Sequence, residues 1–153
     1  LKDPESFFAK YEKMAPEKRE QVMKGYRMLQ EFVRRFAGAG GKIHSGSDPN
    51  HVVPGYAVHA ELQMLVEAGL TPLQAIQTAS INVAQAWGKE KEYGSVEPGK
   101  VADFFIVRGD PEKNISDTQN VEMVFIDGKK MDTSFHSDYK NPLPRPIEDR
   151  PEQ

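Results

Sequence analysis

Three of the four histidines, His44, His51 and His59, lie within sixteen residues of one another, and Asp48 lies among them. Imidazole and carboxylate groups are ligands that zinc and other divalent metals take in proteins, so a metal site is one hypothesis. Along an extended strand, at about 3.3 Å per residue, His44 and Asp48 share a face but lie about 13 Å apart. Both side chains could bind the same ion only if the backbone between them bent sharply. We therefore expect His44 to be a structural, hydrogen-bonded residue.

Asp48 ends a short segment, residues 42–48, whose length and flanking Gly-Gly and Pro-Asn pairs are typical of a strand. Parallel α/β folds place catalytic groups at the carboxyl ends of strands, which makes Asp48 a candidate, although Asp before Pro is equally typical of a turn. His51, in the loop beyond, is a candidate for substrate contact, the alternative being a solvated loop residue. His59 in a predicted helix and His136 in the tail have no predicted partner.

Composition excludes several functional classes. The chain has no cysteine, which excludes disulfides, zinc ribbons and thiol catalysis. With 20 Lys and Arg against 23 Asp and Glu, it offers no basic field for nucleic acid. The longest uninterrupted aliphatic or aromatic run, Phe104–Val107, is far shorter than the ~20 residues of a membrane helix. The chain opens at Leu1 without a visible targeting segment, which predicts a processed chain or a fragment and leaves the compartment unassigned.

Hydrophobic periodicity predicts three helical regions: residues 16–37, 56–68 and 71–87. The first begins at a proline, ends before Gly38 and carries one apolar face, made by Val22, Tyr26, Leu29, Val33 and Phe36. The third opens with the capping box Thr71-Pro72-Leu73-Gln74, and the short polar side chains around Ser80 and Asn82 should interrupt it. We expect Met64, Leu65 and Trp87 to be core residues.

After this region, the hydrophobic period becomes that of strands. Strands are predicted at residues 101–108 and 121–126, with a short third strand around 130–131. Residues 97–100 form a predicted type II turn with Gly99 at positive φ, and Asp127-Gly128 is a hairpin signal. The strand at 42–48 lies between helices and needs partners, so it predicts one βα unit of a larger parallel sheet. With 38% hydrophobic residues, the core should be thin and completed by another chain.

In their order along the chain, these motifs resemble the amidohydrolase superfamily of metal-dependent hydrolases, and within it the imidazolonepropionase-like and prolidase-like branch. The likeness runs from about Gly38 to Met131, and the Glu-Pro-Gly-Lys-x-Ala-Asp segment at residues 97–103 is its most specific part. It is carried by Gly46-Ser47-Asp48 and by residues 59–72, 75–84, 94–107 and 124–129. Residues 97–103 should serve the architecture, and Asp103 and Asp127 should be structural.

The resemblance implies an α/β fold: the last βα unit and helices of a (β/α)8 TIM barrel, plus the C-terminal strands of a small composite β-sandwich. Residues 1–90 would then be barrel, 91–131 sandwich strands and 132–153 a Pro-rich tail. By the same likeness, Asp48 is a metal ligand and the catalytic residue that moves the proton of the attacking water. The cofactor implied is one or two divalent ions, usually zinc.

The family's His-x-His pair, bridging lysine and two further histidine ligands belong to earlier strands that this sequence lacks, and neither His44 nor His51 replaces them by spacing. We therefore expect the C-terminal region of an amidohydrolase that hydrolyses amide, cyclic amide or dipeptide-like C–N bonds, inactive as this chain alone. Its expected partners are the N-terminal barrel portion of the same enzyme and a small-molecule substrate. Whether the chain also forms a homo-oligomer is left open by the sequence. The alternative is a non-catalytic remnant that associates with a partner chain.

Overall fold

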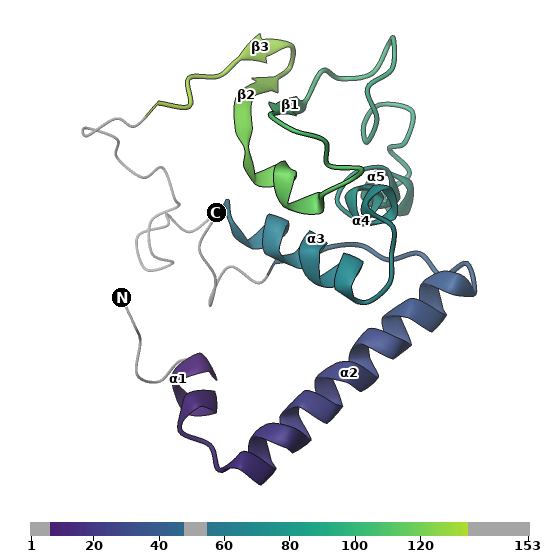
Figure 1. The fold of residues 1–153 in the computed structure, drawn as a ribbon. Helices are drawn as coiled ribbons and strands as arrows, with labels where there is room; N and C mark the ends of the chain where they lie inside the picture. The colour runs from purple at the N-terminus through teal and green to yellow at the C-terminus, as the bar shows by residue number, and fades with distance from the viewer. Residues whose placement is uncertain (1–6, 48–54, 135–153) are drawn as a thin grey trace, which may run out of the picture.

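The computed structural model describes residues 7–47 and 55–134, and these mix helix and strand (Figure 1). The elements, in order, are helices α1 (Phe7–Glu12), α2 (Pro16–Gly38), α3 (Ala57–Glu67), α4 (Pro72–Thr78) and α5 (Ile81–Ala86), strand β1 (Phe104–Val107), 3₁₀ helix η1 (Ile115–Gln119), and strands β2 (Val121–Ile126) and β3 (Lys129–Lys130). In this described part, no helix is both long and apolar enough to cross a membrane.

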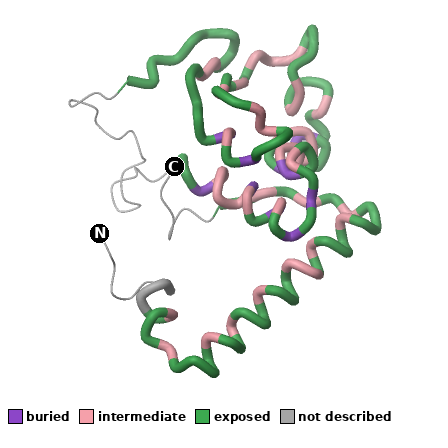
Figure 2. Tube along the Cα trace, viewed as in Figure 1, coloured by how far each residue is buried: buried purple, intermediate pink, exposed green. Residues whose placement is uncertain are grey.

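The hydrophobic core is small and lies where α3, α4 and η1 meet. Its buried residues are Leu62, Leu65, Leu70, Ala75 and Ile115. Figure 2 shows that, among the residues that the structure describes, burial is confined to this region and to α5. Leu65 is buried as predicted, but the expectation is wrong for Met64 and Trp87, which are 46% and 77% exposed. Trp87 follows the end of α5, and no described segment covers it.

Helix α2 begins at Pro16 as predicted and ends at Gly38, one residue beyond its predicted end. Over most of its length it lies apart from the other elements, and it contributes only Val33 and Ala37 to the edge of the core (Figure 1). Leu29 and Phe32 are 65% and 63% exposed, and no residue of the helix is buried. On the predicted apolar face, Val22, Tyr26 and Val33 are therefore partly buried, whereas Leu29 and Phe36 stay exposed.

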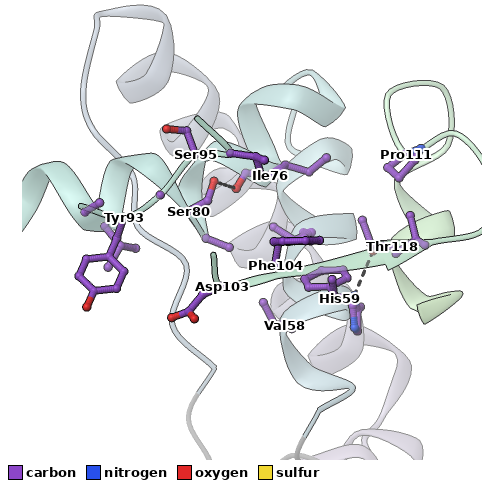
Figure 3. A pocket seen from close by; sticks show the side chains of 18 of the residues that line it. Val58, His59, Ile76, Ser80, Tyr93, Ser95, Asp103, Phe104, Pro111 and Thr118 are labelled. Atoms are coloured by element: carbon purple, nitrogen blue, oxygen red, sulfur yellow. Dashed lines mark hydrogen bonds between the residues drawn. The ribbon is translucent and has the colours of Figure 1, made fainter. Parts of the chain in front are cut away.

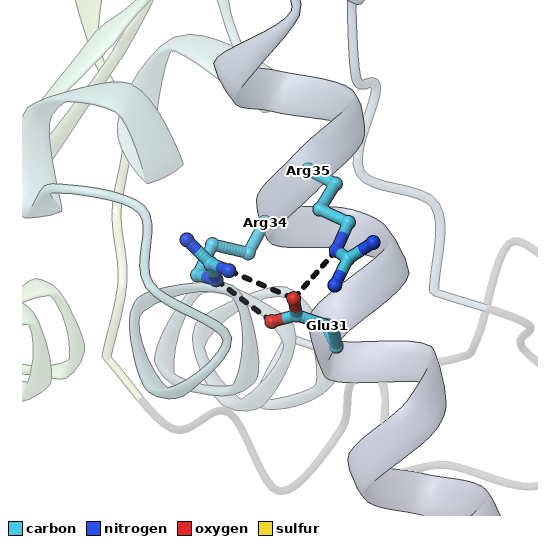
Figure 4. Close-up of polar contacts among 3 residues, drawn as sticks. All are labelled: Glu31, Arg34 and Arg35. Atoms are coloured by element: carbon cyan, nitrogen blue, oxygen red, sulfur yellow. Dashed lines mark hydrogen bonds and ion pairs between the residues drawn. The ribbon is translucent and has the colours of Figure 1, made fainter.

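The opposite face of α2 is charged and solvated. Both oxygens of the Glu31 carboxylate accept hydrogen bonds from Arg34, each at 2.8 Å, and Arg35 Nε donates to the same carboxylate at 2.6 Å (Figure 4). These bonds lower the pKa of Glu31 to about 2. The cluster is exposed and joins residues three and four apart on one helix, so it supports α2 locally and is not a binding site.

The break between α4 and α5 follows from side-chain chemistry. The predicted capping box is present: Thr71 Oγ1 accepts from Gln74 N at 3.2 Å, and the Gln74 side chain accepts from Thr71 N at 2.8 Å. The Ser80 hydroxyl donates to the Ile76 carbonyl at 2.8 Å, a bond that competes with helix continuation. The predicted interruption of this helical region is therefore confirmed at Ser80, whereas Asn82, also expected to interrupt it, lies within α5.

The three strands form an antiparallel sheet in the order β1-β2-β3. Phe104 pairs with Phe125 across β1 and β2, and their rings stack with centroids 4.7 Å apart. Asp127 and Gly128 both have positive φ, 50° and 70°, as a two-residue hairpin turn requires. The Asp103 carboxylate accepts from Asp127 N at 2.7 Å, which gives Asp103 the structural role that we expected.

The predicted strand at residues 42–48 is wrong for the described residues: residues 41–47 form no strand. A strand needs a neighbour to pair with, and the described part of the chain places only helices beside this segment. Gly41 lies so close to the Phe36 ring that a side chain at this position would collide with it. The sequence pattern marked the segment correctly as non-helical, but pairing decides whether it becomes a strand.

Candidate functional site

The residues proposed for chemistry in the sequence fall mainly beyond the described part. Asp48, His51 and His136 lie outside it, so their predicted roles stay predictions. His44 is exposed, near the end of the described segment that leads to Asp48. The site is therefore built here from the groups that hold that segment and from the cavity beside the sheet.

Three helices anchor the segment that leads to Asp48. From α3, the Glu61 carboxylate accepts the Gly46 N–H with both oxygens at 3.0 Å. At the end of α4, the Thr78 carbonyl accepts the Ser45 N–H at 3.1 Å. From α5, Asn82 Nδ2 donates to the Ile43 carbonyl at 3.0 Å. Backbone groups that a sheet would pair are thus paired with helices.

Metal-ligating side chains do not gather in the described residues. Among residues 7–47 and 55–134, no group of three or more His, Asp or Glu side chains is placed so that it could hold an ion. His44 and His59 do not belong to such a group in this part of the chain.

A cavity of about 940 Å³ lies between β1 and helices α3, α4 and α5 (Figure 3). Apolar side chains make most of its wall, including Val58, Leu62, Ile76, Val83, Trp87, Phe104, Phe105 and Val107. Its polar lining groups come from separate elements and include His59 on α3, Ser80 before α5, Ser95 in the loop before the sheet, Asp103 directly before β1, and Thr118 on η1.

These polar groups are already engaged in structural hydrogen bonds. Ser80 donates to a helix carbonyl, Asp103 holds the hairpin, and Ser95 Oγ lies 2.6 Å from a Glu97 carboxylate oxygen and accepts from Lys100 at 2.5 Å. One hydroxyl–imidazole contact lies among the described lining residues, Thr118 Oγ1 with His59 Nδ1 at 3.1 Å, but the buried Thr118 hydroxyl donates its proton to the Ile115 carbonyl. The cavity therefore offers an apolar surface for packing, and its polar groups form no catalytic arrangement.

His59 has a partner that the sequence did not reveal. Its Nδ1 lies 3.1 Å from Thr118 Oγ1 on η1, and its ring meets Phe105 edge to face with centroids 6.3 Å apart. Burial lowers the pKa of His59 below its usual range. The bond joins residues 59 apart in the chain, and no spacing rule predicts such a pair. Glu61 and Asn82 escaped notice for the same reason, since their partners lie 15 and 39 residues away.

Comparison of the chain with known proteins shows which family it resembles. Residues 18–131 match the sequence model of the Amidohydrolase family. The chain is 41% identical over 70 residues to the imidazolonepropionase of Acinetobacter baumannii strain ATCC 17978, covering 42% of the chain and 17% of that protein. It is 50% identical over 42 residues to the adenine deaminase of Mesorhizobium japonicum, covering 28% of the chain and 7% of that protein.

Among solved structures, a Xaa-Pro dipeptidase with methionine bound in its active site is similar to the chain, with a TM-score of 0.63 and 33% identity. The match covers 67% of this chain and 25% of the dipeptidase. The chain thus spans about a quarter of this structural relative, and less of the two curated relatives.

Proposed function

From the premise that the chain belongs to the Amidohydrolase family, we propose that it is the C-terminal region of a hydrolase that cleaves C–N bonds. The bond would lie in an amide, a cyclic amide or a dipeptide-like substrate, and the nucleophile would be water. The observation that carries the proposal is the family match across residues 18–131, joined to the structural likeness to a Xaa-Pro dipeptidase.

In this proposal the chain supplies the end of a (β/α)8 barrel. Helix α2 would precede the last barrel strand, residues 42–48 would become that strand once neighbouring strands are present, and β1 to β3 would belong to a small composite β-sandwich.

The proposed cofactor is a divalent ion, with zinc as our first choice. The described residues do not by themselves fit an ion, since no three potential ligands converge there. Asp48 would contribute one ligand, and the N-terminal barrel portion would supply the others. A divalent ion held there would supply the activation of water, by lowering its pKa towards ~7. Asp48 would accept the proton of the attacking water and pass it to the leaving amine, and His51 would contact the substrate.

The proposed partner is the N-terminal barrel portion of the same enzyme. Two apolar surfaces of the described residues support this: the exposed side of α2 around Leu29 and Phe32, and the cavity beside β1. Burying apolar surface is worth roughly 25 cal/mol per Å², so both surfaces favour a covering segment.

A second candidate function is that of a non-catalytic module that binds a partner chain. The same two apolar surfaces favour it, because a partner chain is enough to cover them and no catalytic residue is required. The two functions differ in what the gene encodes upstream of Leu1. A His-x-His segment there supports the hydrolase, and its absence supports the association module.

The hydrolase proposal is tested with the full-length protein. It is assayed for release of proline from Xaa-Pro dipeptides, for ring opening of an imidazolone-type cyclic amide, and for release of ammonia from adenine. We expect one class to be hydrolysed, the activity to disappear on treatment with a chelator, and Zn²⁺ to restore it. A zinc-loaded protein that hydrolyses none of the three classes would contradict the proposal.

A further inference from the structure

We propose that Asp127 is a site of covalent modification, where the chain isomerises to isoaspartate through the neighbouring Gly128, and that Asp103 restrains this reaction. The inference goes beyond the proposed function and does not depend on it, because it concerns only the turn between β2 and β3. Asp127-Gly128 is the only Asp-Gly or Asn-Gly pair in the sequence.

The reaction uses only groups of these two residues and water. The backbone nitrogen of Gly128 attacks Cγ of the Asp127 side chain, so that a C–N bond forms, a Cγ–O bond breaks and water leaves. Water then opens the resulting cyclic imide at either carbonyl. One opening restores aspartate, and the other leaves the main chain running through the side chain of residue 127, as isoaspartate. Because the water lost is regained, no oxidant, reductant or cofactor is required.

The turn presents the groups that this reaction needs. Asp127 and Gly128 are exposed, so water reaches both residues. In the described part of the chain, the Asp127 carboxylate has no hydrogen-bond or ion-pair partner, whereas the Asp117 carboxylate accepts hydrogen bonds from Asp110 N and Asn114 Nδ2. Glycine also has no Cβ to hinder attack by its nitrogen. The carboxyl group is therefore free, and the nitrogen is unhindered.

Two hydrogen bonds hold the pair in the turn and away from reaction. The Asp103 carboxylate accepts from Asp127 N at 2.7 Å, and the Ala102 carbonyl accepts from Gly128 N at 3.0 Å. The attacking nitrogen is thus engaged as a donor, and the backbone of Asp127, with φ at 50°, is fixed on both sides of the residue. Attack on Cγ requires rotation about the Asp127 Cα–C bond, which would separate Gly128 N from Ala102.

Asp103 sets how often this rotation occurs. Its acceptor is charged, and a hydrogen bond to a charged group is stronger than one between neutral groups. Ala102 and Asp103 are consecutive residues directly before β1, so loss of the Asp103 bond also loosens the Ala102 bond. Since the reaction proceeds only from the opened turn, its rate follows the fraction of molecules in which the turn is open.

The modification would end the pairing of β2 with β3. Isoaspartate adds a carbon atom to the main chain within a two-residue turn, and in hairpins the length of the turn fixes the register of the strands. The pairs Phe125 with Lys130 and Ile126 with Lys129 depend on this register. A reaction at one residue therefore alters the end of the sheet.

The test is incubation of the full-length protein in warm, mildly acidic buffer, beside a peptide of residues 121–131. The peptide is the unrestrained reference, since an isolated two-stranded hairpin is at best marginally stable. Isoaspartate is measured with an isoaspartate-specific methyltransferase and labelled S-adenosylmethionine, and peptide mapping assigns the residue. Amide hydrogen exchange reports the opening of the turn at Gly128.

The variants separate the restraint from general stability of the sheet. Asp103→Ala removes the acceptor, and Asp103→Asn keeps its shape with a neutral, weaker acceptor. The matched control is Glu122→Gln, which removes a carboxylate of the same sheet that pairs with Arg108 and does not touch the turn.

We expect isoaspartate at residue 127 of the parent, formed more slowly than in the peptide. Asp103→Ala should raise the rate about 10–100-fold, up to the rate of the peptide, as the loss of one hydrogen bond to a charged group implies. Asp103→Asn should give a smaller rise, which also decides the matter if Asp103→Ala does not fold. Exchange at Gly128 should speed up in the same order, and Glu122→Gln should match the parent.

Isoaspartate in the peptide but none in either Asp103 variant would overturn the modification site. Rates equal to the parent's in both variants would overturn the restraint, and so would a parent rate equal to that of the peptide. An equal rise in Glu122→Gln would overturn it as well, because general loosening of the sheet would then account for the effect. None of these outcomes depends on hydrolase activity.

Discussion

The protonation of His59 follows from its neighbours. The Thr118 hydroxyl donates its single proton to the Ile115 carbonyl at 2.8 Å, so it can only accept at its contact with His59. Nδ1 of His59 must therefore carry the proton, which makes the neutral ring the Nδ1–H tautomer. The ring is partly removed from water and has Phe105 at its side, and this burial lowers its pKa.

A lowered pKa of His59 predicts a stability that falls in acid. Its folded-state pKa lies below the unfolded value of about 6.5, so the unfolded chain binds the proton first as the pH falls. This contribution is complete above pH ~6.5 and is lost progressively below it. Urea unfolding at pH 7, 6 and 5 should show a smaller acid loss for His59→Gln than for the parent. Equal losses in the two proteins would contradict the assignment, because the other histidines are common to both.

At the scale of elements, the sequence predicts a helix cap, a helix start or a turn correctly wherever the contacts that form it join residues close together in the chain. The capping box at Thr71, the start of α2 at Pro16 and the hairpin at Asp127 each act over a few residues, and each was predictable from the sequence. η1 was missed because its first turn depends on Asn114, whose side chain accepts from Ser116 N, a signal shared with many turns. The strand at residues 42–48 failed because pairing is not local.

Gly99 gives a test of the turn before β1. Its φ is 91°, as the third position of a type II turn requires, and Lys100 N donates to the Glu97 carbonyl at 3.2 Å. A Cβ there would meet no atom within 4 Å, so backbone strain is the main cost of adding one. Gly99→Val should destabilise the protein by about 1–3 kcal/mol, measured by denaturant unfolding.

The control for this substitution is Gly25, within α2, where an added side chain would also meet open space. Gly25→Ala should stabilise the protein by about 0.5–1 kcal/mol, because alanine loses less backbone entropy in a helix. An unchanged free energy of unfolding in Gly99→Val would mean that the turn does not need positive φ.

At the scale of the whole molecule, the core is too small for the apolar surface around it. Large apolar side chains stay exposed on α2, at Trp87 and on the sheet, where Phe105 and Ile126 are each 52% exposed. Surfaces of this kind mark association sites. The composition predicts a thin core, and a core of this size leaves these apolar side chains exposed.

These surfaces predict that the 153-residue chain on its own associates. Sedimentation velocity should show self-association or aggregates, and Phe32→Glu, on the exposed side of α2, should reduce them. Adding the N-terminal portion of the full-length protein should give a defined complex. A stable monomer that unfolds cooperatively at low concentration would contradict this prediction.

The candidate site was predictable only in part, for a physical reason. A motif in the chain can mark Asp48, but the groups that hold the approach to it, Glu61, Thr78 and Asn82, come together through contacts between distant residues. Helix signals correctly placed all three in or beside helices. Their side-chain or carbonyl contacts with residues 43–46 depend on how the helices pack, which no local pattern specifies.

The central claim is that Asp48 is a metal ligand and the proton acceptor of a C–N hydrolase whose C-terminal region is this chain. The most direct test is kcat and zinc content of Asp48→Asn beside the parent, in the full-length protein, with His44→Asn as the matched control. General acid–base catalysis typically contributes 10²–10⁴-fold, so we predict that Asp48→Asn lowers kcat by about that factor and weakens zinc binding, while His44→Asn changes both far less. Near-normal kcat and zinc content in Asp48→Asn would contradict the account and leave Asp48 as a turn residue.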